Sequence, residues 1–109
     1  MEARARNGYQ CGMDTAFAAT LTTWRRHLHA HPGLTLQEAE TAAFVAARLR
    51  EIGVTEIVEG FGGHGVVATL RRGGGNRSVG LRGDMDALPI QETNESLPHR
   101  STIPGVMHA

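Results

Sequence analysis

Residues 35–70, TLQEAETAAFVAARLREIGVTEIVEGFGGHGVVATL, decide the fold class because their apolar pattern changes from a helical period to a strand-like one. Thr35 followed by Glu38 matches a capping box, and Gly53 is a typical helix stop. The apolar stripe between them consists of Ala39, Ala42, Ala43, Ala46, Leu49 and Ile52. Beyond it, Thr55–Glu59 and Gly65–Leu70 have the composition of strands. We therefore predict a helix over residues 35–52 and an α/β fold.

The sequence before this stretch predicts another helix, over residues 14–31. Asp14 can cap its N-terminus, and Pro32 ends it, because the residue before a proline is pushed out of helical geometry. Its apolar face is formed by Phe17, Leu21, Trp24 and Leu28. Residues 1–12 show no periodicity and are typical of a loose N-terminal extension, which leaves residues 13–109 as the folded part.

The sequence after this stretch predicts a third strand, Ser78–Asp84. Gly73–Gly75 precede it and indicate a flexible turn, so this strand should pair antiparallel with residues 65–70. Beyond Asp86 the sequence is irregular and rich in proline. The element order is typical of two helices followed by strands of a mixed sheet, which these residues leave incomplete.

Composition narrows the class of protein. The 109 residues carry 11 Lys and Arg against 11 Asp and Glu, so the formal net charge is zero and no nucleic-acid partner is expected. A single cysteine, Cys11, precludes an internal disulfide and suits a reducing compartment. No apolar run reaches signal-peptide or membrane-spanning length. We expect a cytoplasmic protein that does not interact with membranes.

Two patterns have simpler interpretations than the motifs they suggest. Gly60, Gly62 and Gly65 have the spacing of a dinucleotide-binding fingerprint, but that motif needs a following helix, and a strand follows here. A glycine turn is the better interpretation. His27, His29 and His31 could include a zinc pair at a spacing of four residues, but no glutamate follows His27 to act as the base. We interpret them as structural histidines at the end of a helix, where the dipole favours positive charge.

The most informative segment for function is Leu81–Pro89, which contains Asp84 and Asp86. Alternate residues of a strand face the same side, so Arg82 and both carboxylates should share one face at the end of the third strand. Strand ends are where sites assemble in α/β sheets, and two close carboxylates repel unless a cation or a donor lies between them. A solvated turn is the alternative, since Asp and Pro are common turn residues.

Several motifs in order resemble one family. They are Arg26–Leu34, Glu38–Thr41, Gly63–Val67, Leu81–Pro89 and Gly105–Ala109, within roughly residues 24–109. The pattern is similar to that of metal-dependent amidohydrolases of the hippurate hydrolase and indoleacetyl-amino-acid hydrolase type, related to aminoacylase and to zinc carboxypeptidases and deacylases. The resemblance implies an α/β catalytic domain with a bimetal centre, a smaller lid domain and a homodimer. Residues 13–109 would then be the N-terminal part of that catalytic domain.

The resemblance also implies roles for single residues. Asp86 occupies the position of an aspartate that orients a metal ligand, and Asp84 occupies the position where the wider clan has a metal-binding histidine. The position of Asp84 makes it a candidate metal ligand. Its residue type does not support this role, because the wider clan has a histidine there. His108 is expected to support the ligand loop. The divalent metal would be zinc or manganese, and the substrate an N-acyl amino acid.

The family pattern continues with Cys-Gly-His-Asp directly after Met107-His108-Ala109. The remaining ligands and the general base are therefore expected beyond the C-terminus, in a full-length parent of which this chain is a truncated part. Alone, the chain is expected to be inactive and to hold no metal. Two alternatives stay open: a stand-alone α/β domain that binds a ligand or partner without catalysis, and a short metalloenzyme that uses His27, His29, His31, Asp84 and Asp86.

Overall fold

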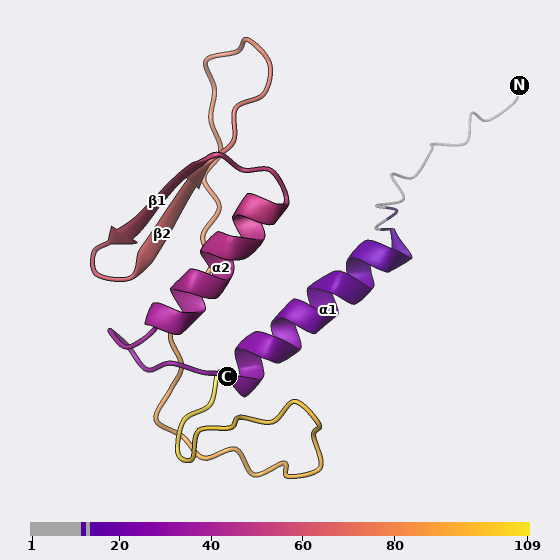
Figure 1. Cartoon of the computed structure of the whole chain (residues 1–109), viewed down its shortest axis with the longest axis vertical. Coiled ribbons are helices and arrows are strands. Elements are labelled where there is room, and N and C mark those ends of the chain that lie inside the picture. The colour runs from indigo at the N-terminus through magenta and orange to yellow at the C-terminus, as the bar shows by residue number, and fades with distance from the viewer. Residues whose placement is uncertain (1–11, 13) are drawn as a thin grey trace, which may run out of the picture.

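The computed structural model describes residue 12 and residues 14–109. It contains two helices followed by two strands: α1 (Thr15–Ala30), α2 (Ala39–Glu51), β1 (Glu56–Phe61) and β2 (Gly65–Thr69) (Figure 1). This order confirms the α/β class and the two predicted helices. The predicted extension over residues 1–12, with Cys11, lies outside the described residues except for Gly12. Neither described helix is long and apolar enough to cross a membrane.

Helix α1 begins where the sequence predicted. The side chain of Asp14 accepts a hydrogen bond from the backbone N–H of Ala16 over 3.2 Å, which satisfies one of the free donors of the first turn. The apolar face of α1 stays largely uncovered, since Phe17 is 48% exposed and Leu21 is 37% exposed. Only the C-terminal end of this helix reaches the rest of the described fold (Figure 1).

Helix α2 begins at Ala39, so the predicted start at Thr35 is wrong. The capping box is absent: Glu38 holds the N-cap position without a side-chain hydrogen bond, and the Thr35 hydroxyl bonds elsewhere. The predicted end is confirmed, because Gly53 adopts a φ of 94°, in the left-handed region that favours glycine. The buried residues of α2 are Thr41, Ala42 and Ala46, and the two alanines form the small core together with Ala87.

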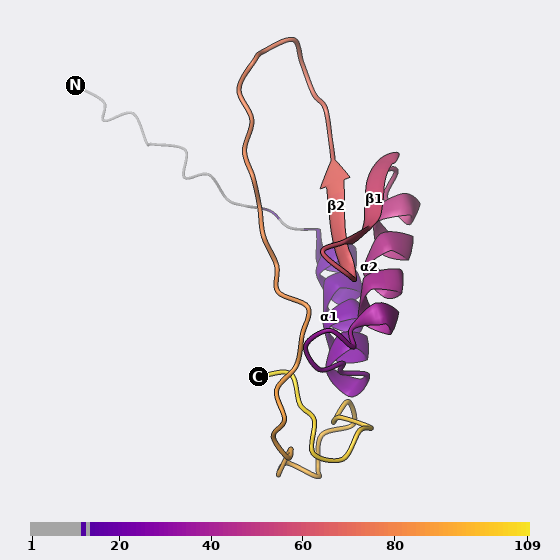
Figure 2. The same ribbon diagram turned by 90° about the vertical axis from the view of Figure 1, so that its left-hand side faces the viewer.

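Strands β1 and β2 form an antiparallel hairpin that packs on α2 (Figure 2). Gly62 and Gly63, with φ values of 63° and 118°, make the turn between them. This confirms the interpretation of the glycine cluster as a turn. The predicted antiparallel pairing of residues 65–70 with residues 78–84 across Gly73–Gly75 is wrong, because residues 78–84 form no strand and the partner of β2 is β1.

Residues 78–84 do not form the predicted third strand. They run back along the hairpin as an extended loop whose backbone has no partner among residue 12 and residues 14–109, and an unpaired strand is not stable in water (Figure 2). Val79 is 89% exposed and Leu81 is 96% exposed. In the part of the chain that the structure describes, pairing resumes at two isolated bridges, a parallel one between Leu34 and Ala87 and an antiparallel one between Leu88 and Met107.

Candidate functional site

Asp86 is held in place through its neighbour Ala87. The Ala87 N–H donates to the carbonyl of Gly33 over 2.7 Å, and Ala87 is only 2% exposed. These contacts fasten the end of the long irregular segment to the loop between α1 and α2. Asp86 is therefore positioned by a backbone bridge and a buried neighbour, where the sequence had predicted the end of a strand.

A tight turn in the loop between α1 and α2 presents Thr35 to Asp86. The Gln37 N–H donates to the Leu34 carbonyl over 2.8 Å, and Leu36 adopts a φ of 63°. A left-handed conformation costs a residue with a side chain about 1–2 kcal/mol. Local backbone strain of this kind is often found at functional sites.

The Thr35 hydroxyl donates to Oδ2 of Asp86 over 2.5 Å. This hydrogen bond, followed by the side chain of Asp84, lowers the pKa of Asp86, and the charge of His108 acts more weakly in the same direction. Partial burial acts in the opposite direction and does not cancel them. Asp86 is thus an ionised acceptor at neutral pH, with one oxygen already oriented by Thr35.

Asp84 lies close to Asp86 but is much more open to solvent. Its side chain is 70% exposed, and its Oδ2 lies 3.9 Å from a guanidinium nitrogen of Arg82. Its Oδ1 accepts a hydrogen bond from the Met85 N–H over 3.1 Å. The structure therefore brings together Arg82, Asp84 and Asp86, although the segment that carries them is not a strand.

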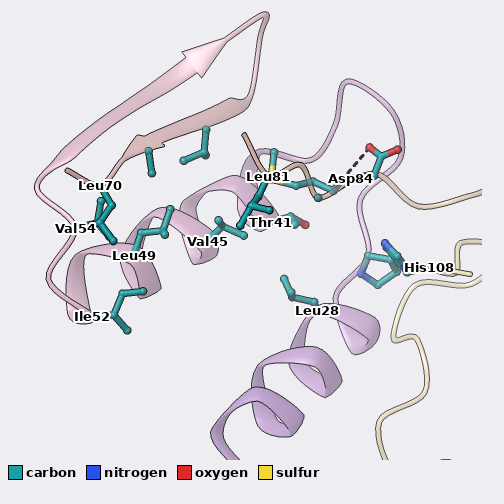
Figure 3. Close-up of a pocket in the computed structure, with 15 residues that line it drawn as sticks. Leu28, Thr41, Val45, Leu49, Ile52, Val54, Leu70, Leu81, Asp84 and His108 are labelled. Carbon is teal, nitrogen blue, oxygen red and sulfur yellow. Dashed lines mark hydrogen bonds between the residues drawn. The ribbon is translucent and has the colours of Figure 1, made fainter. Parts of the chain in front are cut away.

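His108 lies on the segment that the Leu88–Met107 bridge holds beside the segment of Asp86, and its charge acts weakly on the pKa of Asp86. It lines one end of an apolar cavity of about 590 Å³, together with Asp84 (Figure 3). Leu28 of α1 and Val45 of α2 contribute to the walls, and Ile52 lies at the opposite end. The arrangement places one carboxylate, Asp84, and the imidazole of His108 at the rim of an apolar hollow.

The three histidines of α1 and its C-cap do not converge. The rings of His27 and His31 stack at 4.4 Å, and His27 also stacks on Phe44 at 4.3 Å. His29 points instead to Glu92, with 3.0 Å between Nε2 and Oε1. These contacts are structural, as the sequence interpretation held.

The fit of a metal to the described residues is partial. Asp84, Asp86 and His108 offer oxygen and nitrogen donors of the type that divalent metals use. Among residue 12 and residues 14–109, however, no group of three or more His, Cys, Asp or Glu side chains is arranged to hold a metal ion. The short-metalloenzyme hypothesis thus has no ligand set within this part of the chain.

Sequence reasoning missed two polar residues of this region. Thr35 was assigned to a capping box, although its hydroxyl bonds Asp86, which lies 51 residues away. Glu92 was not singled out, although it pairs with His29 across 63 residues. Both contacts are long-range, and nothing in the local sequence pattern signals them.

Known proteins that the chain resembles include metal-binding peptidases and amidohydrolases. No protein-family model matches the chain. The fold is similar to that of the Bacillus subtilis YXEP protein, a dinuclear metal binding peptidase from the M20 family, with a TM-score of 0.76 and 38% identity. That match covers 88% of this chain and 26% of the YXEP chain. The described fold is therefore similar to part of the fold of that peptidase.

Two relatives with a similar sequence are named as hydrolases. The hippurate hydrolase of Campylobacter jejuni is 45% identical over 85 residues, which are 78% of this chain and 22% of that protein. The N-acyl-L-amino acid amidohydrolase of Geobacillus stearothermophilus is 49% identical over 86 residues, which are 79% of this chain and 23% of that protein. The chain is a homologue of amidohydrolases of this type, which confirms the resemblance found in its motifs, and it spans about a fifth of their length.

Proposed function

We propose that this chain serves in a metal-dependent amidohydrolase that cleaves the amide bond of N-acyl amino acids. The relatives named for this activity support the reaction class, and the observation in this chain that carries the proposal is the hydrogen bond from Thr35 to the ionised Asp86. A fold alone does not define a reaction. A carboxylate with one oxygen oriented by a hydroxyl is suited to orient a metal-binding group.

Asp86 is proposed to accept a hydrogen bond from the ring N–H of a metal-binding imidazole. Such a bond fixes the ring orientation and tautomer of the ligand and raises its basicity. Asp84 is more exposed, and we propose that it adds negative charge beside the metal, with direct ligation as the less favoured role. The metal, when bound, would activate a water molecule and polarise the amide carbonyl. Zinc and manganese are the candidates.

The remaining ligands and the base are proposed to lie in sequence that these 109 residues do not contain. Homodimerisation and a cytoplasmic location are part of the same proposal, carried by the family resemblance alone. The experiment is to purify the full-length protein, measure bound zinc and manganese by elemental analysis, and assay hydrolysis of hippurate and acetylated amino acids. Activity that disappears with a chelator and returns with metal is expected. Full activity in metal-free protein would refute the proposal.

A second candidate is a stand-alone α/β domain that binds an apolar ligand or partner without catalysis. The open apolar cavity of about 590 Å³ favours it, because its size falls within the range of small-molecule sites. This candidate predicts that the 109-residue chain alone is a soluble, stable protein. The amidohydrolase proposal predicts that it is not, so the solution behaviour of the chain separates the two.

A further inference from the structure

A backbone bridge closes the loop formed by residues 88–107. The Leu88 N–H donates to the Met107 carbonyl over 2.9 Å, and the Met107 N–H donates to the Leu88 carbonyl over 3.1 Å. The residues between them, all described, contain no helix and no strand. Asp86 precedes this bridge and His108 follows it, so the closure of the loop sets how close these two side chains lie.

Glu92 ties this loop to α1. Its side chain is 8% exposed, and Oε1 lies 3.0 Å from Nε2 of His29. Oε2 accepts a hydrogen bond from the Ser101 N–H over 2.6 Å. Both oxygens of this nearly buried carboxylate thus have a partner. One contacts His29 of α1, and the other accepts from Ser101 on the far side of the loop. Such charge-assisted bonds are stronger than neutral ones, and their loss leaves a polar group buried without partners.

The hydrogen bonds of Glu92 continue into the end of the loop. The Ser101 hydroxyl donates to the Val106 carbonyl over 2.6 Å, directly before Met107. The N–H and the hydroxyl of Thr102 both donate to the carbonyl of Ala30, the last residue of α1, over 2.9 and 2.7 Å. The path from Glu92 to the bridge therefore consists of short polar contacts, with no regular secondary structure to take their place.

We propose that Glu92 is a positioning residue, which holds the loop of residues 88–107 against the C-terminal end of α1 and so keeps His108 beside Asp86. It does not touch Asp86, and it acts through the Leu88–Met107 bridge. The catalytic consequence of this role rests on the proposed function. The structural consequence, the stability of the bridge, does not.

Three variants of the full-length protein test the role. Glu92→Ala removes both hydrogen bonds. Glu92→Gln keeps an oxygen for the Ser101 N–H and offers an amide N–H to the ring of a neutral His29, so it should rescue the contact. Glu95→Ala is the matched control, because Glu95 is an exposed carboxylate on the same loop.

Two readouts are measured on each variant: kcat and KM for hippurate, and hydrogen exchange of the Met107 amide. Misplacement of groups by about 1 Å can lower turnover roughly 100-fold. We expect E92A to lower kcat by at least about tenfold, with KM changed less than about threefold. Exchange at Met107 should be faster in E92A and near the wild-type rate in E92Q and E95A.

Wild-type kcat in E92A would overturn the positioning role, and so would unchanged exchange at Met107. A fall in activity as large in E92Q as in E92A, with exchange still protected, would also overturn it. If E92A does not fold, His29→Ala, which removes the contact of Glu92 with α1 and leaves its bond to Ser101 in place, gives the same comparison with the same outcomes. If the wild-type protein hydrolyses no N-acyl amino acid, the proposed function fails, and the exchange at Met107 still decides whether Glu92 holds the loop.

Discussion

Replacing Gly33 with alanine should loosen the attachment of the Asp86 segment to the loop between α1 and α2. A Cβ at this position would lie 2.8 Å from the Gln37 carbonyl oxygen and 3.0 Å from the Glu38 Cα, both backbone atoms. The shorter distance is about 0.6 Å inside the 3.4 Å at which ordinary contact begins, so the backbone must shift. The shift acts on the same turn that carries Thr35 and on the carbonyl that binds Ala87.

Overpacking of this kind typically costs about 1–3 kcal/mol. A local destabilisation of that size corresponds to roughly 5- to 150-fold faster exchange of an amide that the contact protects. The amide to measure is Ala87, whose N–H donates to Gly33. Gly80→Ala is the matched control, because a Cβ there meets nothing within 4 Å. Exchange at Ala87 that is equal within about twofold in the two variants would refute the reasoning.

Three further predictions concern the site and the chain. In the full-length protein, Asp86→Asn should lower turnover by about 10–100-fold while circular dichroism stays unchanged; wild-type turnover and metal content would favour the solvated-turn interpretation. Thr35→Val should move the pKa of Asp86 back up toward its ordinary value, since the Thr35 hydrogen bond is the largest cause of the lowering. A lowered pKa in the folded state adds stability above the unfolded pKa of about 4, and this stability is lost as the pH falls through the folded value. Unfolding midpoints should therefore differ between wild type and T35V at pH 7, and this difference should shrink as the pH falls below about 4. A difference that stays equal as the pH falls would contradict this. Residues 1–109 expressed alone should neither hydrolyse hippurate nor bind one equivalent of zinc or manganese, as elemental analysis and the hydrolysis assay would show; a soluble monomer with bound metal and turnover would favour the short metalloenzyme.

Elements that depend on local sequence could be predicted, and elements that depend on distant partners could not. The start of α1 follows from Asp14 and the end of α2 from Gly53, because a cap and a stop act within one helical turn. Thr35 has the sequence of a cap as well, but its hydroxyl has a stronger acceptor in Asp86. The Thr35 hydroxyl therefore bonds a distant carboxylate in place of the helix N-terminus, and local sequence does not reveal that partner.

The failed third strand has a similar explanation. Residues 78–84 have strand composition, but composition describes how well side chains suit a sheet and not whether a neighbouring strand exists. In the described residues β2 pairs with β1, and no strand lies beside residues 78–84. The Leu81–Pro89 motif nevertheless singled out the segment that carries Asp84 and Asp86, because a motif identifies residues whatever their local geometry, and the role of Asp86 stays a prediction.

The pattern of burial bears on the choice between the two proposed functions. The buried apolar residues among those described are Ala42, Ala46 and Ala87, and no large side chain among them is fully buried. Each alanine removes little apolar surface from water, and folding must offset a conformational entropy cost of roughly 1–2 kcal/mol per ordered residue. A stand-alone binding domain would need a larger core than this. The apolar cavity and the 96% exposed Leu81 are therefore better explained as surfaces that further protein covers than as a finished ligand site. The small amount of buried apolar surface thus favours the amidohydrolase proposal over the stand-alone domain.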